Sequence, residues 1–277
     1  MKKLFAMMLA AAMLLSCAAC GNTEDGAQDR LDEIKERGYL TVATEPYFAP
    51  NEFIDPTKTG DEQYVGLDIE LAKYIAGEIG VELQIVPLEF TAVQAGVADG
   101  KYDLAISALA YSPTRAEAMN LSDVYLASDT GFGFLVREED VDKYTSIDSL
   151  ADAVVITQSG SVQESLYNAN VEECKEFKLV SAMTDGYLAV SEGKADVCIC
   201  AISSGDLYAE ANGGLATTSF RFEVDPNMNG EVIGAPVEDT ESLIELVNEC
   251  IAQLNAEGKI EAWEEEYTAY AATLGIE

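Results

Sequence analysis

Helical and strand-like spacings of apolar residues alternate along the first part of the chain. Residues 66–79 (GLDIELAKYIAGEI) place apolar side chains three and four positions apart, which predicts an amphipathic helix that ends at Gly80. Residues 81–87 (VELQIVP) alternate apolar and polar positions, as a half-buried strand does. The same reasoning predicts helices over 29–37, 66–79 and 90–98, strands over 39–44, 81–87 and 102–108, and a loop over 45–53. This order favours a parallel sheet covered by helices.

The alternation restarts after an extended segment at 130–136. Another extended segment at 230–236 precedes a mostly helical region at 240–270. Two sets of strands and helices separated by extended segments predict two α/β lobes with a cleft between them. The second set comprises strands over 153–157, 177–180 and 195–201 and helices over 162–167, 184–192 and 204–210.

The first twenty residues have the pattern of a lipoprotein signal peptide. Lys2 and Lys3 precede an apolar stretch, 4–15, that is too short to span a membrane as a mature helix. We expect cleavage after residue 19 and lipidation of Cys20, because the sequence AACGN leads directly into a polar tether. Cys17 is the alternative, since the leucine three residues before it fits a lipidation motif better. An ordinary secretory signal with incidental cysteines is a further alternative.

Lipid chains on Cys20 would anchor the protein to the extracytoplasmic face of the cell membrane without spanning it. In that arrangement, residues 1–19 are the signal peptide and residues 20–37 are a lipidated tether followed by a short helix.

Charge and cysteine usage exclude several classes of function. The formal net charge of −34 opposes binding to nucleic acid or docking on anionic lipid through a basic patch. The chain has no histidine, and no cysteine pair beyond the signal has the spacing of a zinc site, so we expect no metal. The remaining cysteines are Cys174, Cys198, Cys200 and Cys250. We expect most of them to be buried as small apolar residues. A disulfide bridge from Cys174 to Cys198 or Cys200 is the alternative.

Several short motifs, in order, resemble those of the bacterial extracellular solute-binding proteins, family 3, which serve importers of polar amino acids. The resemblance covers residues 38–274. Its motifs are GLDIELA at 66–72, DGKYD at 99–103, SPTR at 112–115, LSDVY at 121–125, GKAD at 193–196 and GKIEAW at 258–263. In the last motif the Trp comes early and the Lys that usually precedes it is absent.

The resemblance implies two Rossmann-like lobes joined by two hinge strands, as in type II periplasmic binding proteins. Lobe one would comprise 38–131 plus 231–277, and lobe two 132–230. It also implies a monomeric substrate-binding lipoprotein of an ABC importer, with permease subunits as partners and no cofactor.

Arg115 matches the arginine that binds the ligand's carboxylate in this family. A guanidinium meets a carboxylate through two parallel hydrogen bonds, which Lys cannot copy. The N–H of Ala110 is expected to join it in lobe one. The alternative is an Arg on a helix surface paired with Glu117 or another acid.

The resemblance places the other half of the carboxylate site in lobe two. Ser161, Val162 and Gln163 match a loop at a helix N-terminus, where free N–H groups and the Ser161 hydroxyl can meet the same carboxylate. The alternative for Ser161 is a simple helix cap.

Phe48, Phe90 and Glu45 match positions that surround the ligand's side chain. The two aromatic rings would form walls on either side of it, and Glu45 would touch its polar end. The alternatives are core packing for both rings and an ordinary loop acid for Glu45.

Two departures from the family pattern concern the ligand's amino group. Ala110 and Ala201 occupy positions where the family places side-chain acceptors for an α-ammonium. A buried ammonium without a partner costs several kcal/mol. We therefore expect a small carboxylate-bearing ligand, with an amino acid as the leading class, whose amino group is bound differently, modified or absent. Substitute acceptors would be Ser107, Ser203, Ser204 or Glu45.

The main alternative function is an enzyme on the same fold, such as a dehydratase of prephenate-like acids. It would need Glu45 or Glu89 as general acid or base, because the chain has no histidine. No paired candidates stand out, so we expect a binding protein rather than an enzyme. A surface adhesin is a further alternative.

Overall fold

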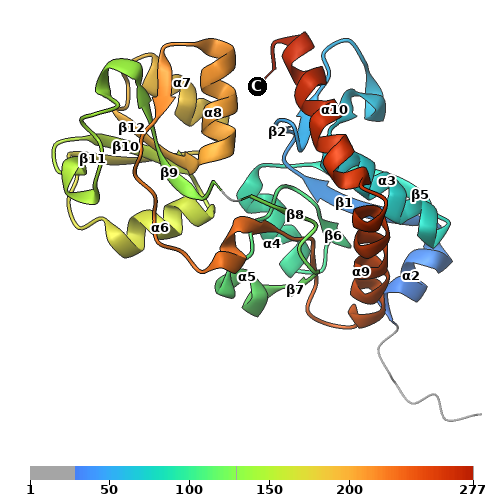
Figure 1. Cartoon of the computed structure of the whole chain (residues 1–277). Coiled ribbons are helices and arrows are strands. Elements are labelled where there is room, and N and C mark those ends of the chain that lie inside the picture. Colours follow the sequence, from blue (N-terminus) through green and yellow to red (C-terminus); the bar gives the residue numbers. More distant parts are fainter. Residues whose placement is uncertain (1–28, 129, 277) are drawn as a thin grey trace, which may run out of the picture.

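The computed structural model describes residues 29–128 and 130–276, and the predicted signal peptide and both candidate lipidation sites, Cys17 and Cys20, lie outside them. Two groups of strands and helices stand side by side, joined by extended segments (Figure 1). Within the described ranges, no helix combines the length and the apolar character needed to cross a membrane.

Lobe one is built on a five-stranded sheet with β1 (Tyr39–Thr44) near its middle. β1 pairs in parallel with β5 on one side and β6 on the other, as the alternating pattern predicted. The order is β5 (Glu82–Pro87), β1, β6 (Leu104–Ala105), β15 (Gly234–Ala235) and β7 (Asn120–Leu121). The last two strands run antiparallel to their neighbours at β6–β15 and β15–β7.

Helices cover both faces of this sheet through two apolar clusters. One cluster joins the sheet to α2 (Arg30–Arg37), α3 (Leu67–Ile79) and α9 (Glu241–Ala256), and the other joins it to α4 (Phe90–Ala98). α2 contributes the buried residues Leu31 and Ile34, so this helix belongs to the core of lobe one rather than to a tether. The predicted helices at 29–37, 66–79 and 90–98 are confirmed.

Lobe two repeats the same arrangement. Its sheet has the order β11 (Glu176–Val180), β10 (Val154–Gln158), β12 (Val197–Ala201), β9 (Phe132–Arg137) and β13 (Leu215–Thr217). The first three strands are parallel, and β9 is antiparallel to both of its neighbours. α6 (Val162–Asn170) packs on one face, and α7 (Met183–Ser191) and α8 (Ile202–Asn212) pack on the other.

A two-stranded ribbon lies where the chain passes between the lobes. β8 (Leu126–Ala127) pairs with β14 (Gly230–Glu231), so the outgoing and returning segments are hydrogen-bonded to each other. Figure 1 shows β8 between the two groups of elements. The two-lobe architecture and its hinge agree with the expected fold class; the lobe boundaries themselves stay predictions.

Three segments differ from the sequence-based expectation. The expected loop at 45–53 contains strands β2 (Tyr47–Phe48) and β3 (Glu52–Ile54), which form a small sheet with β4 (Tyr64–Val65). The strand expected at 102–108 is only two residues long, because the chain turns toward the cleft after Ala105. The helical region at 240–270 divides at Gly258 into α9 and α10 (Lys259–Leu274).

The remaining short elements connect these layers. Pro113–Ala118 forms α5, which begins at Ser112 as its cap. The 3-10 turns are Gly60–Gln63, Glu138–Asp140, Ile147–Leu150 and Pro226–Asn229.

The four cysteines within the described ranges, Cys174, Cys198, Cys200 and Cys250, are free thiols. Cys198 and Cys200 are buried on the α7–α8 side of the lobe-two sheet, whereas Cys174 packs with the cluster on the α6 side. The alternative of a bridge from Cys174 to the strand cysteines is therefore wrong, because the sheet separates them.

An aspartate holds an inner strand of the sheet in each lobe, and the one in lobe one, Asp103, is fully buried. The Asp103 carboxylate accepts hydrogen bonds from the Thr41 N–H and hydroxyl, both at 2.7 Å, and pairs with Arg30 at 2.7 Å and with Arg37. In lobe two, Asp196 accepts from the Val154 N–H at 2.8 Å and pairs with Arg137 at 3.2 Å. These are the aspartates of the DGKYD and GKAD motifs.

Replacing Asp103 by Ala is expected to destabilise the protein by about 3 kcal/mol, because two guanidinium groups lose a fully buried partner. Urea unfolding at pH 7 measures the change. Asp99→Ala, at an exposed position in the same turn, is the matched control. Equal stability of the two variants would contradict this role for Asp103.

Candidate functional site

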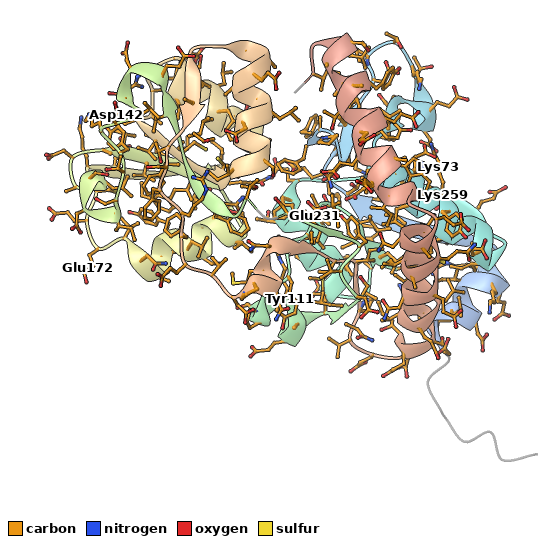
Figure 2. All side chains as sticks on the ribbon, in the orientation of Figure 1. Lys73, Tyr111, Asp142, Glu172, Glu231 and Lys259 are labelled. Atoms are coloured by element: carbon orange, nitrogen blue, oxygen red, sulfur yellow. The ribbon has the colours of Figure 1, made fainter. Side chains whose placement is uncertain are left out.

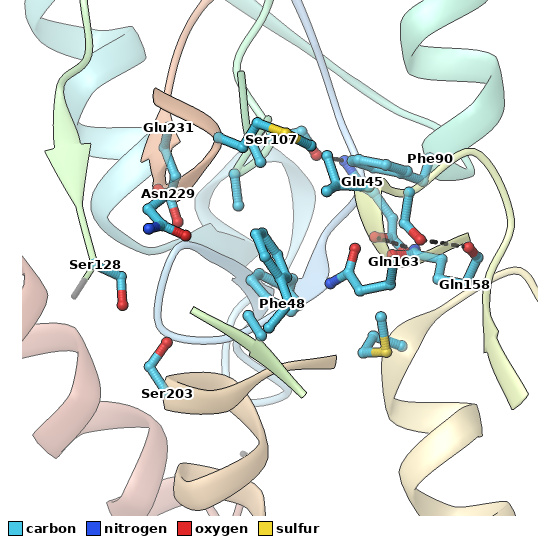
Figure 3. A pocket seen from close by; sticks show the side chains of 18 of the residues that line it. Glu45, Phe48, Phe90, Ser107, Ser128, Gln158, Gln163, Ser203, Asn229 and Glu231 are labelled. Carbon is cyan, nitrogen blue, oxygen red and sulfur yellow. Dashed lines mark hydrogen bonds between the residues drawn. The ribbon is translucent and has the colours of Figure 1, made fainter. Parts of the chain in front are cut away.

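A pocket lies between the lobes, and all ten residues predicted for the site line it (Figure 3). They come from both halves of the molecule: Glu45, Phe48, Phe90, Ser107, Ala110 and Arg115 from lobe one, and Ser161, Val162, Gln163 and Ala201 from lobe two. The structure brings these positions together, while their contact with a ligand stays a prediction.

The pocket lies at the carboxyl ends of the parallel strands. Glu45 follows β1, Ser107 follows β6, Gln158 ends β10, and Ala201 ends β12. Open α/β sheets bind ligands at this edge, where loops leave the strands and helices begin. Side chains from the two sheets therefore face each other across the cleft.

Arg115 is held by α5 and is 6% exposed. Its Nε donates to Gln94 Oε1 at 2.9 Å, one terminal nitrogen donates to the Ala110 carbonyl, and the other donates to the Gly160 carbonyl at 3.0 Å. The guanidinium also lies over the Phe90 ring, 5.4 Å from its centre. Because Gly160 belongs to lobe two, the Arg115 contact with its carbonyl crosses the cleft.

The charge of Arg115 has only neutral hydrogen-bond partners. No carboxylate of the described residues forms an ion pair with it, and burial lowers its pKa to about 10, so it stays charged at pH 7. An unpaired buried cation is costly, and a carboxylate that reached it would form strong charge-assisted bonds. The alternative of a surface Arg paired with Glu117 is wrong, since Arg115 is buried.

The Ser161 hydroxyl is already used within the protein. It accepts a hydrogen bond from the Glu164 N–H at 3.1 Å, as the cap of α6, and donates its only proton to the Gln158 carbonyl at 2.7 Å. The hydroxyl therefore has no proton left for a carboxylate in this structure. The backbone N–H groups of the first turn of α6 and the side-chain amide of Gln163 are further donors on this side of the pocket.

Both alanine departures lie in the pocket wall. Ala110 contributes its carbonyl to Arg115 and pairs across an isolated β-bridge with Glu231. Ala201 ends β12 on the opposite side. Each presents a methyl group, so neither side chain can accept a hydrogen bond from an ammonium.

Glu45 takes part in another hydrogen bond across the cleft. Its Oε2 accepts from Gln158 Nε2 at 3.0 Å, and its side chain is almost fully buried. Burial raises the pKa of Glu45 to about 7, more than the Gln158 hydrogen bond lowers it. It is therefore not an ordinary exposed loop acid.

Glu52 and Asp68 place two carboxyls beside each other below the pocket. Glu52 accepts a hydrogen bond from the Ser107 hydroxyl at 2.9 Å. Burial, and next the charge of Asp68, raise the pKa of Glu52 well above its usual range. Two adjacent buried carboxyls cannot both ionise cheaply, so Glu52 holds a proton at neutral pH.

Asp68, from the GLDIELA motif, shapes the rim of the pocket. Its carboxylate accepts from the Ala108 N–H at 2.7 Å and from the Tyr125 hydroxyl at 2.9 Å. Ala108 has a positive φ of 44°, an uncommon conformation for a residue with a side chain. The bond from Asp68 thus helps to hold a strained turn in the pocket wall.

Several pocket residues were not predicted. Gln158 could have been found from the sequence, because it directly follows the strand predicted at 153–157; in the structure it is the last residue of β10. Glu231 and Asn229 have none, because their position depends on pairing with residues more than a hundred positions away. The others that line the pocket are Glu52, Ala108, Ser128, Gly131, Phe132, Met183 and Met228.

The substitute acceptors named from the sequence divide into two groups. Ser107, Ser203 and Glu45 line the pocket, whereas Ser204 does not and instead bonds to the Tyr187 hydroxyl at 2.8 Å. Glu89, the other candidate acid for an enzyme, is exposed at the start of α4 and is outside the pocket lining. In the part of the chain that the structure describes, no group of three acidic, cysteine or histidine side chains is placed to hold a metal ion.

Comparison with known proteins identifies the family. The family model for bacterial extracellular solute-binding proteins, family 3, matches residues 40–270. The chain belongs to this family. The match includes every element that lines the pocket.

Individual family members are similar over much of the chain. The arginine-binding extracellular protein ArtP of Bacillus subtilis is 28% identical over 59% of this chain and 58% of its own length. The L-cystine-binding protein TcyJ of Escherichia coli K12 is 24% identical over 86% of this chain and 85% of its own. An amino acid ABC transporter substrate-binding protein, AbpA, from Streptococcus pneumoniae, solved with L-arginine bound, is 31% identical. That structure has a TM-score of 0.79 and covers 89% of this chain and 99% of its own.

Gly160→Ala is expected to hold the lobes apart. Gly160 has a φ of +74°, and an added Cβ would lie 2.9 Å from Thr91 Cγ2 and 3.2 Å from Gln94 Nε2 across the cleft. Gly193 has a similar φ of +71°, and a Cβ added there would meet no atom within 4 Å. Gly193→Ala therefore strains the backbone to the same extent as Gly160→Ala but makes no contact across the cleft. Small-angle X-ray scattering should give a larger radius of gyration for Gly160→Ala alone. An equal radius of gyration for the two variants would show that the added Cβ of Gly160→Ala does not hold the lobes apart.

Glu45→Gln is expected to stabilise the protein at pH 8 but hardly at pH 5. Below pH 4.5, the pKa of Glu45 in the unfolded chain, this carboxyl is protonated in both the folded and the unfolded protein. Between pH 4.5 and about 7, the folded protein keeps a proton on Glu45 that the unfolded protein releases. Stability therefore falls as pH rises through this window, and the substitution removes that loss. We expect a gain of about 2 kcal/mol at pH 8, measured by urea unfolding.

Glu82→Gln, at an exposed position of β5, is the control for the Glu45 variant. A change in stability for Glu45→Gln that is the same at pH 5 and pH 8 would rule out the raised pKa.

Proposed function

We propose that this protein is the substrate-binding component of an ABC importer and captures an amino acid between its lobes. Its family consists of extracellular solute-binding proteins, and similar proteins bind arginine and cystine. The pocket between the lobes has walls from both sheets, as a clamp that closes on a small ligand requires.

The observation that carries the proposal is Arg115, a buried cation with neutral partners in the wall of the cleft. An amino acid's carboxylate would supply the missing negative charge. The open N–H groups at the start of α6 would meet the same carboxylate from lobe two. Binding in this way would draw the lobes together and exclude water from the contact.

The attachment of the protein to the cell belongs to the same proposal. Lipid on Cys20, or on Cys17, would hold the domain at the outer face of the membrane, close to permease subunits that receive the ligand. The protein would act as a monomer, without a cofactor.

Arg115→Met is expected to weaken amino-acid binding by about a hundredfold or more, because the ligand's carboxylate would be buried without its partner. Thermal unfolding with and without each standard amino acid and L-cystine measures binding, since a ligand that binds only the folded state raises the melting temperature. Lys101→Met, at an exposed position, is the control.

The proposal fails if none of these compounds shifts the melting temperature of the wild-type protein. It also fails in its mechanism if Arg115→Met binds as tightly as the wild type does.

Glu45 is the specific observation in favour of an enzyme, because a buried carboxyl with a pKa of about 7 can act as a general acid or base at neutral pH. Incubation with prephenate, followed by absorbance, tests the dehydratase alternative. Turnover that Glu45→Gln abolishes would favour that alternative over simple binding.

A further inference from the structure

The two adjacent carboxyls of Glu52 and Asp68 differ in their hydrogen-bond partners. Both oxygens of Asp68 accept: Oδ1 from the Tyr125 hydroxyl at 2.9 Å, and Oδ2 from the Ala108 N–H at 2.7 Å. Glu52 Oε1 accepts from the Ser107 hydroxyl at 2.9 Å. Glu52 Oε2 is buried and receives no hydrogen bond from the described residues. A protonated carboxyl donates through one of its oxygens, so Oε2 is the atom that carries the proton and donates it to Asp68.

The surroundings of this pair are acidic. Neither carboxyl forms an ion pair with a Lys or Arg of the described residues. The other ionisable groups that face the pair are Glu45 after β1, Tyr125 before β8 and Glu231 on β14. Loss of the proton would therefore place two adjacent anions where no cation offsets them.

The pair connects two loops of the pocket wall. The Ser107 hydroxyl, which donates to Glu52, also accepts from the Glu45 N–H at 2.9 Å. The loop after β1 and the loop after β6 are thereby joined through Ser107 and Glu52. Asp68 holds the next residue, Ala108, in its strained conformation with a φ of 44°. Figure 3 shows Glu45 and Ser107 in the pocket whose wall these two loops form.

The same pair is linked to both strands of the hinge ribbon. Tyr125, which donates to Asp68, directly precedes β8. Asn51, the neighbour of Glu52 in the chain, donates through Nδ2 to Glu231 Oε2 on β14 at 2.8 Å. Figure 2 shows Glu231 at the junction between the lobes. The pair therefore lies where the pocket wall meets the hinge.

We propose that Glu52 is a positioning residue for ligand capture: the proton that it donates to Asp68 holds both pocket loops and the base of the hinge ribbon in the arrangement that binds. An uncharged amide can replace Glu52, because its carbonyl can accept from Ser107 and its NH2 group can donate to Asp68. An amide cannot replace Asp68 in the same way, because both of its oxygens already accept from other donors. The effect on capture rests on the proposed function, whereas the place of the proton does not.

Glu52→Gln tests the place of the proton. Burial, and next the charge of Asp68, raise the pKa of Glu52 well above its ordinary value of 4.5, so above pH 4.5 the folded protein keeps a proton that the unfolded chain releases. The wild type therefore loses stability relative to Glu52→Gln as the pH rises. In urea unfolding, the ratio of the wild-type unfolding constant to that of Glu52→Gln should rise at least about thirtyfold from pH 5 to pH 8.

Glu62→Gln, at an exposed position before β4, is the matched control. Its unfolding constant relative to the wild type should change less than about twofold over the same range of pH.

Asp68→Asn tests the positioning. Hydrogen exchange of the backbone amides of residues 104–110 reports whether the loop after β6 keeps its conformation, and residues 154–158 of β10 are the internal control. Exchange at 104–110 should be at least about tenfold faster in Asp68→Asn than in the wild type, and within about threefold of the wild type in Glu52→Gln. In calorimetric titrations with L-arginine and L-cystine, Asp68→Asn should bind at least about tenfold more weakly than Glu52→Gln.

The outcomes separate this inference from the proposed function. A ratio of unfolding constants that does not change with pH shows that Glu52 is ionised in the folded protein and overturns the inference. Equal exchange in Glu52→Gln and Asp68→Asn, or faster exchange in Glu52→Gln, also overturns it. The pH profile needs only the wild type and Glu52→Gln, so it decides the matter if Asp68→Asn does not fold. Failure of L-cystine and every standard amino acid to bind overturns the proposed function, while the exchange and unfolding results still decide the role of Glu52.

Discussion

The cleft depends on a buried positive charge, that of Arg115, which has no negative partner among the residues that the structure describes. Arg115 is stabilised by the Gln94 amide, two carbonyls and the Phe90 ring, which together hold its guanidinium in place without neutralising it. One of those carbonyls belongs to Gly160 in the opposite lobe, so the same side chain that would receive a ligand also draws the lobes together. A carboxylate entering here would meet a preformed donor set and gain from an already desolvated charge.

Buried acids impose a second constraint on the same space. Glu45, Glu52 and Glu231 all have raised pKa values, mainly because they are buried. Each of these acids lowers the free energy of unfolding at neutral pH relative to a neutral side chain in the same place. Such a loss of stability is common at binding sites, where complementarity to a ligand matters more than stability. The pocket therefore combines one cation with several poorly solvated acids, of which Glu231 lies on one side of Phe48 and Glu45 on the other (Figure 3).

The sequence predicted the regular elements well, since helices such as α3 and strands such as β1 and β5 have clear periodicity and glycine stops. The resemblance to the family predicted ten residues that line the pocket, and they lie where parallel strands bring their carboxyl ends to one edge. It could not predict that the Ser161 hydroxyl is occupied by the Gln158 carbonyl, since local geometry decides that. Nor could it predict the β2–β3 hairpin, whose strands are too short for a periodic signal, or Glu231, which reaches the cleft only through pairing of β14 with β8.

The clamp around Asp103 has a mechanical consequence. Arg30 and Arg37 lie at the two ends of α2, and both bind the same carboxylate at the start of the lobe-one sheet. Figure 1 places α2 at the edge of lobe one that faces away from lobe two. A mechanical force applied to the chain at residue 29 would therefore act on Asp103 and on the lobe-one sheet. It would exert little torque on the β8–β14 ribbon about which the lobes turn.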